Sequence, residues 1–198
     1  MKKLFLIILA LGMAAGIALP AYSQTFGIEG HLLYAFEFDG DLSGETIEPK
    51  DSFGGGGALI FAPSPFLKFD LGVDYLKPKI KNYDIPELSG SKIEMLPLTL
   101  GFRVGPSIEP VFLYVGAGIG YSYNDASGGG DWLTLKDCWT YYACLGAELF
   151  LTDNLVLRPE LRYNWLKPEL QVGLFDGKAK EDWKLDHFQG RLGLGLYF

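Results

Sequence analysis

Apolar and polar residues alternate along several segments of this chain. Between Leu67 and Tyr75 every second residue is apolar, and the residues between them include Lys68, Asp70 and Asp74. A period of two is typical of a β-strand that has one apolar and one polar face. The same alternation recurs in other segments, and it predicts eight strands at about 25–39, 52–62, 66–77, 93–104, 111–123, 138–150, 155–166 and 187–198.

The first segment shows how cleanly the two faces separate. The register that contains Phe26, Tyr34 and Phe38 has no polar member, whereas the other register holds Glu37 and Asp39. We therefore expect the whole of the first register, Phe38 included, to lie on the apolar face of the strand.

Short turns and long loops join the predicted strands in alternation. The turns span 62–65, 105–110 and 151–154, and the last of the four loops lies at about 167–183. An even number of antiparallel strands with short turns on one side and long loops on the other is the pattern of bacterial outer-membrane barrels. We predict an all-β fold, an eight-stranded antiparallel up-and-down transmembrane β-barrel, with both ends of the mature chain on the periplasmic side.

Charged residues decide between this barrel and a soluble β-sandwich. The four arginines all fall in the register opposite the aromatic residues, and acids of the strands follow them. A sandwich would turn its charges to water, but here the apolar face continues around eight strands and needs lipid. We expect an inward polar network, either structural or pore-lining, formed by Glu29, His31, Lys68, Asp70, Asp74, Arg103, Glu148, Arg158, Glu160, Arg162 and Arg191.

The members of this network should form pairs. Side chains just fill an eight-stranded barrel, and a buried charge is costly unless it is paired. Glu148 and Arg158 flank the turn at 151–154, so we expect them to be neighbours across adjacent strands. We also expect Arg191, on the last strand, to meet Glu29 or His31 on the first.

The N-terminal stretch has a different character. Lys2 and Lys3 precede an apolar run over 4–19, and small residues at positions 21 and 23 suit a signal peptidase. A membrane anchor is the alternative, but no stop-transfer charges follow the run. We predict a cleaved signal peptide at 1–23 and an outer-membrane β-barrel domain at 24–198, exported through the periplasm to the bacterial cell outer membrane.

Charge and cysteine content narrow the function further. The net charge is -7, whereas a nucleic-acid partner would require a basic surface, so we expect no nucleic-acid binding. Cys138 and Cys144 are the two cysteines, and six residues of strand span roughly 20 Å. A disulfide holds its Cα atoms about 4.4–6.8 Å apart. If both cysteines lie in one strand, they cannot be bonded.

Lipid-modifying enzymes also occur on small barrels. A deacylase of that kind needs a His beside a Ser in one strand, and neither His31 nor His187 has a Ser two residues away. We expect His187 to lie partly exposed near the outer rim. Clustered metal ligands do not occur. We therefore expect no enzyme activity, no catalytic, cofactor-binding or metal site, and no cofactor.

Two stretches resemble a known family. "PVFLYVGAGIGYSYND" (110–125) resembles the fifth-strand motif of the small outer-membrane β-barrel domain family, which includes OmpX-like, opacity-like and OmpW-like barrels. "GRLGLGLYF" (190–198) resembles the C-terminal signal that the barrel assembly machinery reads. The resemblance implies that Leu194, Leu196 and Phe198 form an assembly signal. It also implies that the partners are this machinery, outer-membrane lipid and lipopolysaccharide.

The resemblance leaves more than one function open. OmpW-like barrels have a proposed function in the passage of small hydrophobic molecules, and "LPLTLGFR" (96–103) is similar to their Pro-containing central strand. Pro97 cannot donate a ladder hydrogen bond. The charged inward register, however, departs from OmpW-like interiors, which are more apolar, and this departure argues against a hydrophobic conduit.

We therefore retain two hypotheses. The first is a narrow or plugged barrel with limited passage of small solutes, including hydrophobic ones, and it predicts a gap in the inward network or in the wall near Pro97. The second is a structural or surface-interaction role through the outer loops, which predicts ordered loops and a sealed interior. A lipid-modifying barrel enzyme is a distant third.

Overall fold

A computed structural model describes residues 25–42, 45–46, 48–81, 92–127, 133–174 and 177–198. The predicted signal peptide, 1–23, lies outside the described residues. No helix in the described part of the chain is long and apolar enough to cross a membrane.

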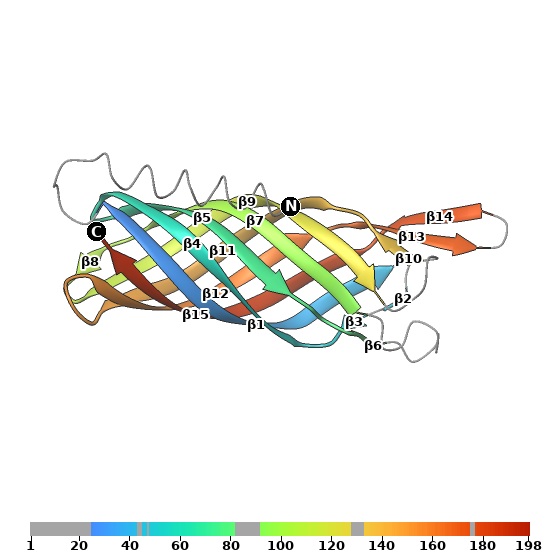
Figure 1. Cartoon of the computed structure of the whole chain (residues 1–198), viewed down its shortest axis with the longest axis horizontal. Coiled ribbons are helices and arrows are strands. Elements are labelled where there is room, and N and C mark those ends of the chain that lie inside the picture. Colours follow the sequence, from blue (N-terminus) through green and yellow to red (C-terminus); the bar gives the residue numbers. More distant parts are fainter. Residues whose placement is uncertain (1–24, 43–44, 47, 82–91, 128–132, 175–176) are drawn as a thin grey trace.

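Long antiparallel strands close into one barrel, which confirms the predicted fold (Figure 1). Each strand pairs with its neighbours along the chain, and the last strand pairs with the first. The eight wall strands are β1 (Phe26–Leu42), β4 (Ser52–Ser64), β5 (Leu67–Leu76), β7 (Lys92–Val104), β9 (Val111–Ser127), β11 (Cys138–Phe150), β12 (Leu155–Leu166) and β15 (Lys184–Tyr197).

The two ends of the barrel differ. The turn end carries the short connections, the C-terminus and β8 (Ser107–Ile108), and the loop end carries the long connections (Figure 1). Short turns face the periplasm in bacterial barrels, which makes the loop end the outer one. The predicted loops hold further strands there: β2 (Glu45–Thr46), β3 (Glu48–Pro49), β6 (Ile80–Lys81), β10 (Leu133–Leu135), β13 (Glu169–Leu174) and β14 (Gly177–Asp182).

Chain closure occurs between the first and the last residues of the wall. Phe198 N donates to Phe26 O at 2.7 Å, and Phe26 N donates to Phe198 O at 3.5 Å. Because unpaired peptide groups are very costly in hydrocarbon, these bonds remove the edge that an open sheet would expose to lipid.

Alternation along the strands sorts the side chains as predicted, with one exception on β1. Leucines and aromatic residues of the outward register are exposed, and the inward register is buried. Glu37 has a positive φ of 51°, and the pairing of β1 with β15 shifts between Phe36 and Asp39. This bulge turns Phe38 inward, where it is buried, so the prediction that Phe38 lies on the apolar outer face was wrong.

His187, which contacts Phe38, is also more buried than the sequence predicts. The ring of His187 stacks on Phe38 with centroids 4.7 Å apart and is 3% exposed, so His187 is buried rather than partly wet. Its Nδ1 lies 3.0 Å from the carbonyl oxygen of Leu185.

The two cysteines both lie on β11 as free thiols, with Cys144 buried.

Apolar side chains fill the lumen near the loop end. This group, the loop-end cluster, escaped the sequence analysis because its members come from inward positions near strand ends and from the loop strands. It consists of Leu33, Ala35, Phe38, Leu76, Ile93, Met95, Leu135, Leu166, Leu170, Trp183 and Leu185.

Inward glycines give tyrosine rings room to cross the lumen. A Cβ on Gly118 would lie 2.4 Å from Tyr142 Cε1 and 2.6 Å from Leu100 O. We expect Gly118→Ala to lower the free energy of unfolding by about 1–3 kcal/mol, because overpacking forces the ring and the backbone apart. Urea titration of the protein in lipid vesicles measures this change.

Gly30 provides the matched control. It faces outward, and a Cβ there would meet nothing within 4 Å. Gly30→Ala should leave the urea midpoint close to that of the wild type. Equal losses in the two variants would contradict a packing role for Gly118.

Candidate functional site

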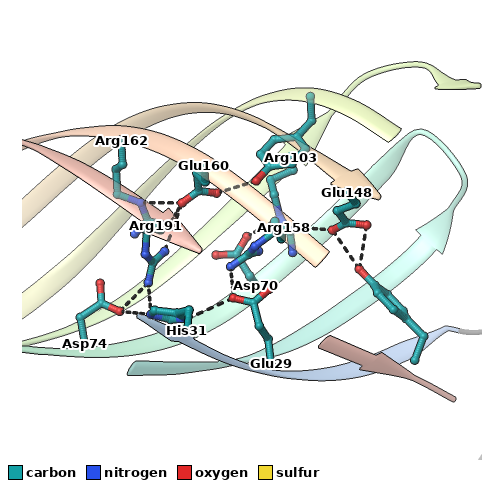
Figure 2. Close-up of polar contacts among 12 residues, drawn as sticks. Glu29, His31, Asp70, Asp74, Arg103, Glu148, Arg158, Glu160, Arg162 and Arg191 are labelled. Atoms are coloured by element: carbon teal, nitrogen blue, oxygen red, sulfur yellow. Dashed lines mark hydrogen bonds and ion pairs between the residues drawn. The ribbon is translucent and has the colours of Figure 1, made fainter. Parts of the chain in front are cut away.

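The predicted inward residues meet inside the barrel between its two ends (Figure 2). They come from six strands, and each side chain is buried in the lumen. The set contains Lys68, Arg103, Arg158, Arg162 and Arg191 as cations, Glu29, Asp70, Asp74, Glu148 and Glu160 as carboxylates, and His31. Five cations therefore face five carboxylates, which is the balance that a desolvated cluster needs.

Glu148 is the centre of the half nearer the turn end. Lys68 and Arg103 both pair with its carboxylate, and Tyr197 donates to it at 3.0 Å. Arg103 Nε also donates to Asp70 Oδ1 at 3.1 Å. Lys68, Arg103 and Tyr197 come from β5, β7 and β15 and Glu148 from β11, so these three contacts join strands that are not neighbours in the sheet. The contact between Arg103 and Asp70 joins the neighbouring strands β7 and β5.

Aromatic rings enclose the ammonium group of Lys68. Its Nζ lies 4.6 Å from the ring centroid of Phe112, 5.3 Å from that of Phe150 and 4.7 Å from that of Tyr197. A cation held against ring faces is stabilised without water. The turn end of the lumen is thus filled by packed charge and aromatic surface.

The expected ion pair between Glu148 and Arg158 does not form between these two described residues. The register between β11 and β12 places Glu148 and Arg158 opposite each other. Arg158 nevertheless forms its ion pair with Glu29. Glu29 lies on β1, beyond the intervening strand β15, and in so narrow a barrel a long side chain reaches past the neighbouring strand. Adjacency along the sheet therefore does not select the partner.

His31 is the centre of the other half of the cluster. Its Nε2 lies 2.7 Å from Asp74 Oδ1, and its Nδ1 lies 3.1 Å from Glu29 Oε1. Arg191 Nη2 lies 2.5 Å from both His31 Nε2 and Asp74 Oδ1, and Arg191 Nη1 donates to Glu160 Oε1 at 3.2 Å. Of the two partners expected for Arg191, the structure places His31 in contact.

Tyrosines complete the cluster, and the sequence analysis did not single them out. Tyr114 donates to Glu160 at 2.9 Å, and Tyr142 donates to Asp70 at 3.1 Å. The guanidinium of Arg162 lies 3.6 Å from the ring centroid of Tyr142. The sequence could have indicated them, because both tyrosines lie in the inward register. The hydroxyl of a Tyr that faces a charged lumen needs a hydrogen-bond partner.

A small cavity lies between the charged cluster and the loop-end cluster. Its volume is about 10 Å³, close to the space that one water molecule needs. The sequence analysis singled out three of its lining residues, Asp74, Pro97 and His187. The cavity is lined by Asp74, Leu76, Met95, Pro97, Thr99, Ser122, Thr140, Asn164, Leu166, His187 and Gln189.

The barrel wall is interrupted beside this cavity. The ladder between β5 and β7 runs through Val73 and Leu98 and resumes only at Leu76 and Met95. Pro97 lies in this gap opposite Asp74 and has no N–H to donate. The ladder between β5 and β7 therefore lacks pairs next to the small cavity.

The arrangement around His31 does not resemble a hydrolytic site. Among the described residues its side-chain contacts are two carboxylates and Arg191, with no hydroxyl or thiol to activate. No group of His, Cys, Asp and Glu in the described ranges is arranged to hold a metal ion. The buried charged side chains form ion pairs and hydrogen bonds with one another.

The family model described as outer membrane protein beta-barrel domain matches residues 5–198. No curated protein matches the sequence significantly.

Several solved structures share the fold. OprG from Pseudomonas aeruginosa is 18% identical with a TM-score of 0.72, over 89% of this chain and 96% of that one. AlkL, solved in DMPC lipid bilayers, is 18% identical with a TM-score of 0.66, over 91% and 93%. OmpW from E. coli is 17% identical with a TM-score of 0.53, over 90% and 100%.

Neutralising Glu148 tests whether the cluster holds the barrel together. We expect Glu148→Gln to lower the free energy of unfolding by about 3–5 kcal/mol, because Lys68 and Arg103 then stay buried without their partner. Urea titration in lipid vesicles measures the loss. Glu94→Gln is the control, since the Lys77–Glu94 pair is solvent-exposed and should contribute less than about 1 kcal/mol. Similar losses in both variants would contradict a structural role for the cluster.

Proposed function

This chain belongs to the outer membrane protein beta-barrel domain family and is a bacterial outer-membrane protein, and on that premise we propose how it acts. It admits small, mostly apolar solutes at the loop end and releases them sideways through the wall beside Pro97. It is a passage with a lateral exit rather than an open channel, and it performs no catalysis.

The interrupted ladder beside the cavity carries this proposal. Wall strands separate most easily where ladder hydrogen bonds are missing, and the two missing pairs of β5 and β7 lie next to the small cavity. An opening at this place would connect the lumen with the hydrocarbon of the bilayer. A solute that leaves by this route must dissolve in lipid, so it must be mostly apolar.

The charged cluster supports a lateral exit rather than a route along the axis. A solute that continued toward the turn end would have to displace Arg191 from Asp74 and Glu160, and then Arg103 from Glu148. Separating buried ion pairs is costly. The sideways route breaks none of these pairs.

The loop-end cluster supports entry of apolar molecules. Leu135 of β10, Leu170 of β13 and Trp183, the residue before β15, belong to one cluster with inward residues of the wall. The Nε1 of Trp183 is buried and has no hydrogen-bond partner among the described residues. Such a surface favours apolar solutes over strongly hydrated ones.

A second candidate function is surface interaction through the loop end. The strands β10, β13 and β14 form a separate three-stranded sheet there (Figure 1). An ordered sheet beyond the barrel offers backbone edges to another protein. Removing residues 169–182 should abolish such binding, whereas lateral passage requires the wall at Pro97.

Restoring the missing donor tests the lateral exit. Pro97→Val supplies an N–H to the β5–β7 ladder, and a ladder hydrogen bond contributes about 1 kcal/mol. We expect uptake of radiolabelled naphthalene by porin-deficient cells that express the variant to be about fivefold lower than with the wild type. Heat-modifiable gel mobility verifies that the barrel has folded.

Pro159→Val is the matched control. Pro159 interrupts the β11–β12 ladder in the same way, but Arg158 and Glu148 fill the interior behind it. This variant should take up naphthalene like the wild type. Unchanged uptake with Pro97→Val, or an equal loss with Pro159→Val, would contradict the lateral exit.

Conductance in a planar lipid bilayer tests the blocked axis. The wild type should show no discrete single-channel steps, because the paired charges fill the lumen. Regular single-channel current steps from the folded wild-type protein would indicate an axial pore and would contradict the blocked axis. Arg158→Ala, which removes the partner of Glu29, is the comparison variant for any residual current.

A further inference from the structure

Three lysines lie side by side on adjacent strands at the loop end. Lys79 forms an antiparallel bridge with Lys92 at the start of β7. Lys50 N donates to Lys79 O at 2.7 Å, and this bond continues the pairing of β3 with β6 (Figure 1). Lys50, Lys79 and Lys92 therefore form one row across three chain segments, which we name the lysine row.

The lysine row lies on the outer surface of the barrel. Directly opposite residues of an antiparallel pair share a face, and all three side chains are exposed. Lys79 continues the outward register of β5, which includes Tyr75, and Lys92 continues that of β7, which includes Leu96. The row thus projects from the same side of the wall as the lipid-facing residues.

The ammonium groups of the row repel one another without local compensation. Like charges directly opposite each other destabilise a sheet, and none of the three forms an ion pair with a described residue. The nearby acids Asp51 and Glu94 have other partners, because Tyr34 donates to Asp51 at 2.7 Å and Lys77 pairs with Glu94. Asp125, opposite Glu94, and Glu48, two residues before Lys50 on β3, are the other acids near the row among the described residues.

The height of the row on the barrel matches the level of lipid headgroups. Tyr75 is half-exposed near the end of β5, where aromatic residues occupy the membrane interface. Lys79 follows four residues later, roughly 13 Å farther along the strand. The opposite end of the barrel contrasts with this, since its turns at 62–65, 105–110 and 151–154 contain no lysine or arginine.

We propose that the lysine row is a binding site for the phosphate groups of an outer-leaflet lipid headgroup. An anion with several charged oxygens can contact ammonium groups on all three segments and remove their repulsion. The lipid chains would then lie along the apolar outer wall below the row. This site lies outside the lumen and does not depend on the proposed passage of solutes.

Lipid binding to the folded protein in maltoside micelles tests this site. Native mass spectrometry would follow a titration with lipid A that carries two phosphates. We expect the K50Q/K79Q/K92Q variant to bind lipid A about 100-fold more weakly than the wild type, since each lysine near an anionic surface contributes about one factor of five. The single variant K79Q should show a smaller loss, and gel mobility on heating verifies that each variant is folded.

A charge-matched control separates the row from general electrostatics. K136Q/K167Q/K184Q removes the same charge from other loop-end positions, two of which are already paired with Glu169 and Asp39. This control should bind lipid A like the wild type, and dephosphorylated lipid A should bind weakly to every form of the protein. Equal losses in both triple variants, no loss in the first, or equal binding of dephosphorylated lipid would overturn the proposal. Inorganic phosphate that binds as tightly as lipid A would overturn the assignment to a lipid.

Discussion

An unpaired peptide group in hydrocarbon costs several kcal/mol, and this constraint underlies every other feature of the barrel. The wall has to close on itself, and the bonds between Phe26 and Phe198 complete the circle. Closure with eight strands leaves a lumen that side chains fill. The interior chemistry then follows from what can be packed and neutralised in that narrow space.

Charge and size are matched both between neighbouring strands and across the lumen of the barrel. Glu148 has partners on β5, β7 and β15, and Arg158 reaches Glu29 on β1. Inward glycines stand where tyrosine rings lie over the neighbouring strand, as Gly118 does beside Tyr142. Because Glu148, Arg158 and their partners lie on strands that are not neighbours in the sheet, the cluster holds the cross-section of the barrel as well as neutralising its interior. At Pro97 the wall lacks a ladder bond, and a small cavity lies behind it.

Much of this structure could be predicted from the sequence because a strand in a barrel has only two faces. Alternation alone located the wall strands and identified the inward charges, and the family resemblance was confirmed. Alternation fails where the backbone departs from regular pleating, as the bulge at Glu37 shows by turning Phe38 inward. Partners within the cluster could not be predicted, because contacts across a lumen depend on strand tilt and stagger. The loop-end cluster was missed for a related reason, since Leu135 and Leu170 come from segments without a visible strand pattern.

The contacts across the lumen also constrain the order in which the barrel can assemble. Glu29 and His31 come from the first strand, and Arg191 and Tyr197 from the last. A sheet that lacks β15 has lost Arg191, so its carboxylates outnumber its cations, and that imbalance lies on the face destined for the interior. Such a sheet cannot enter hydrocarbon one hairpin at a time without exposing unpaired charge to lipid. Its charged face has to remain hydrated until β15 meets β1, which makes closure and membrane insertion a single concerted event.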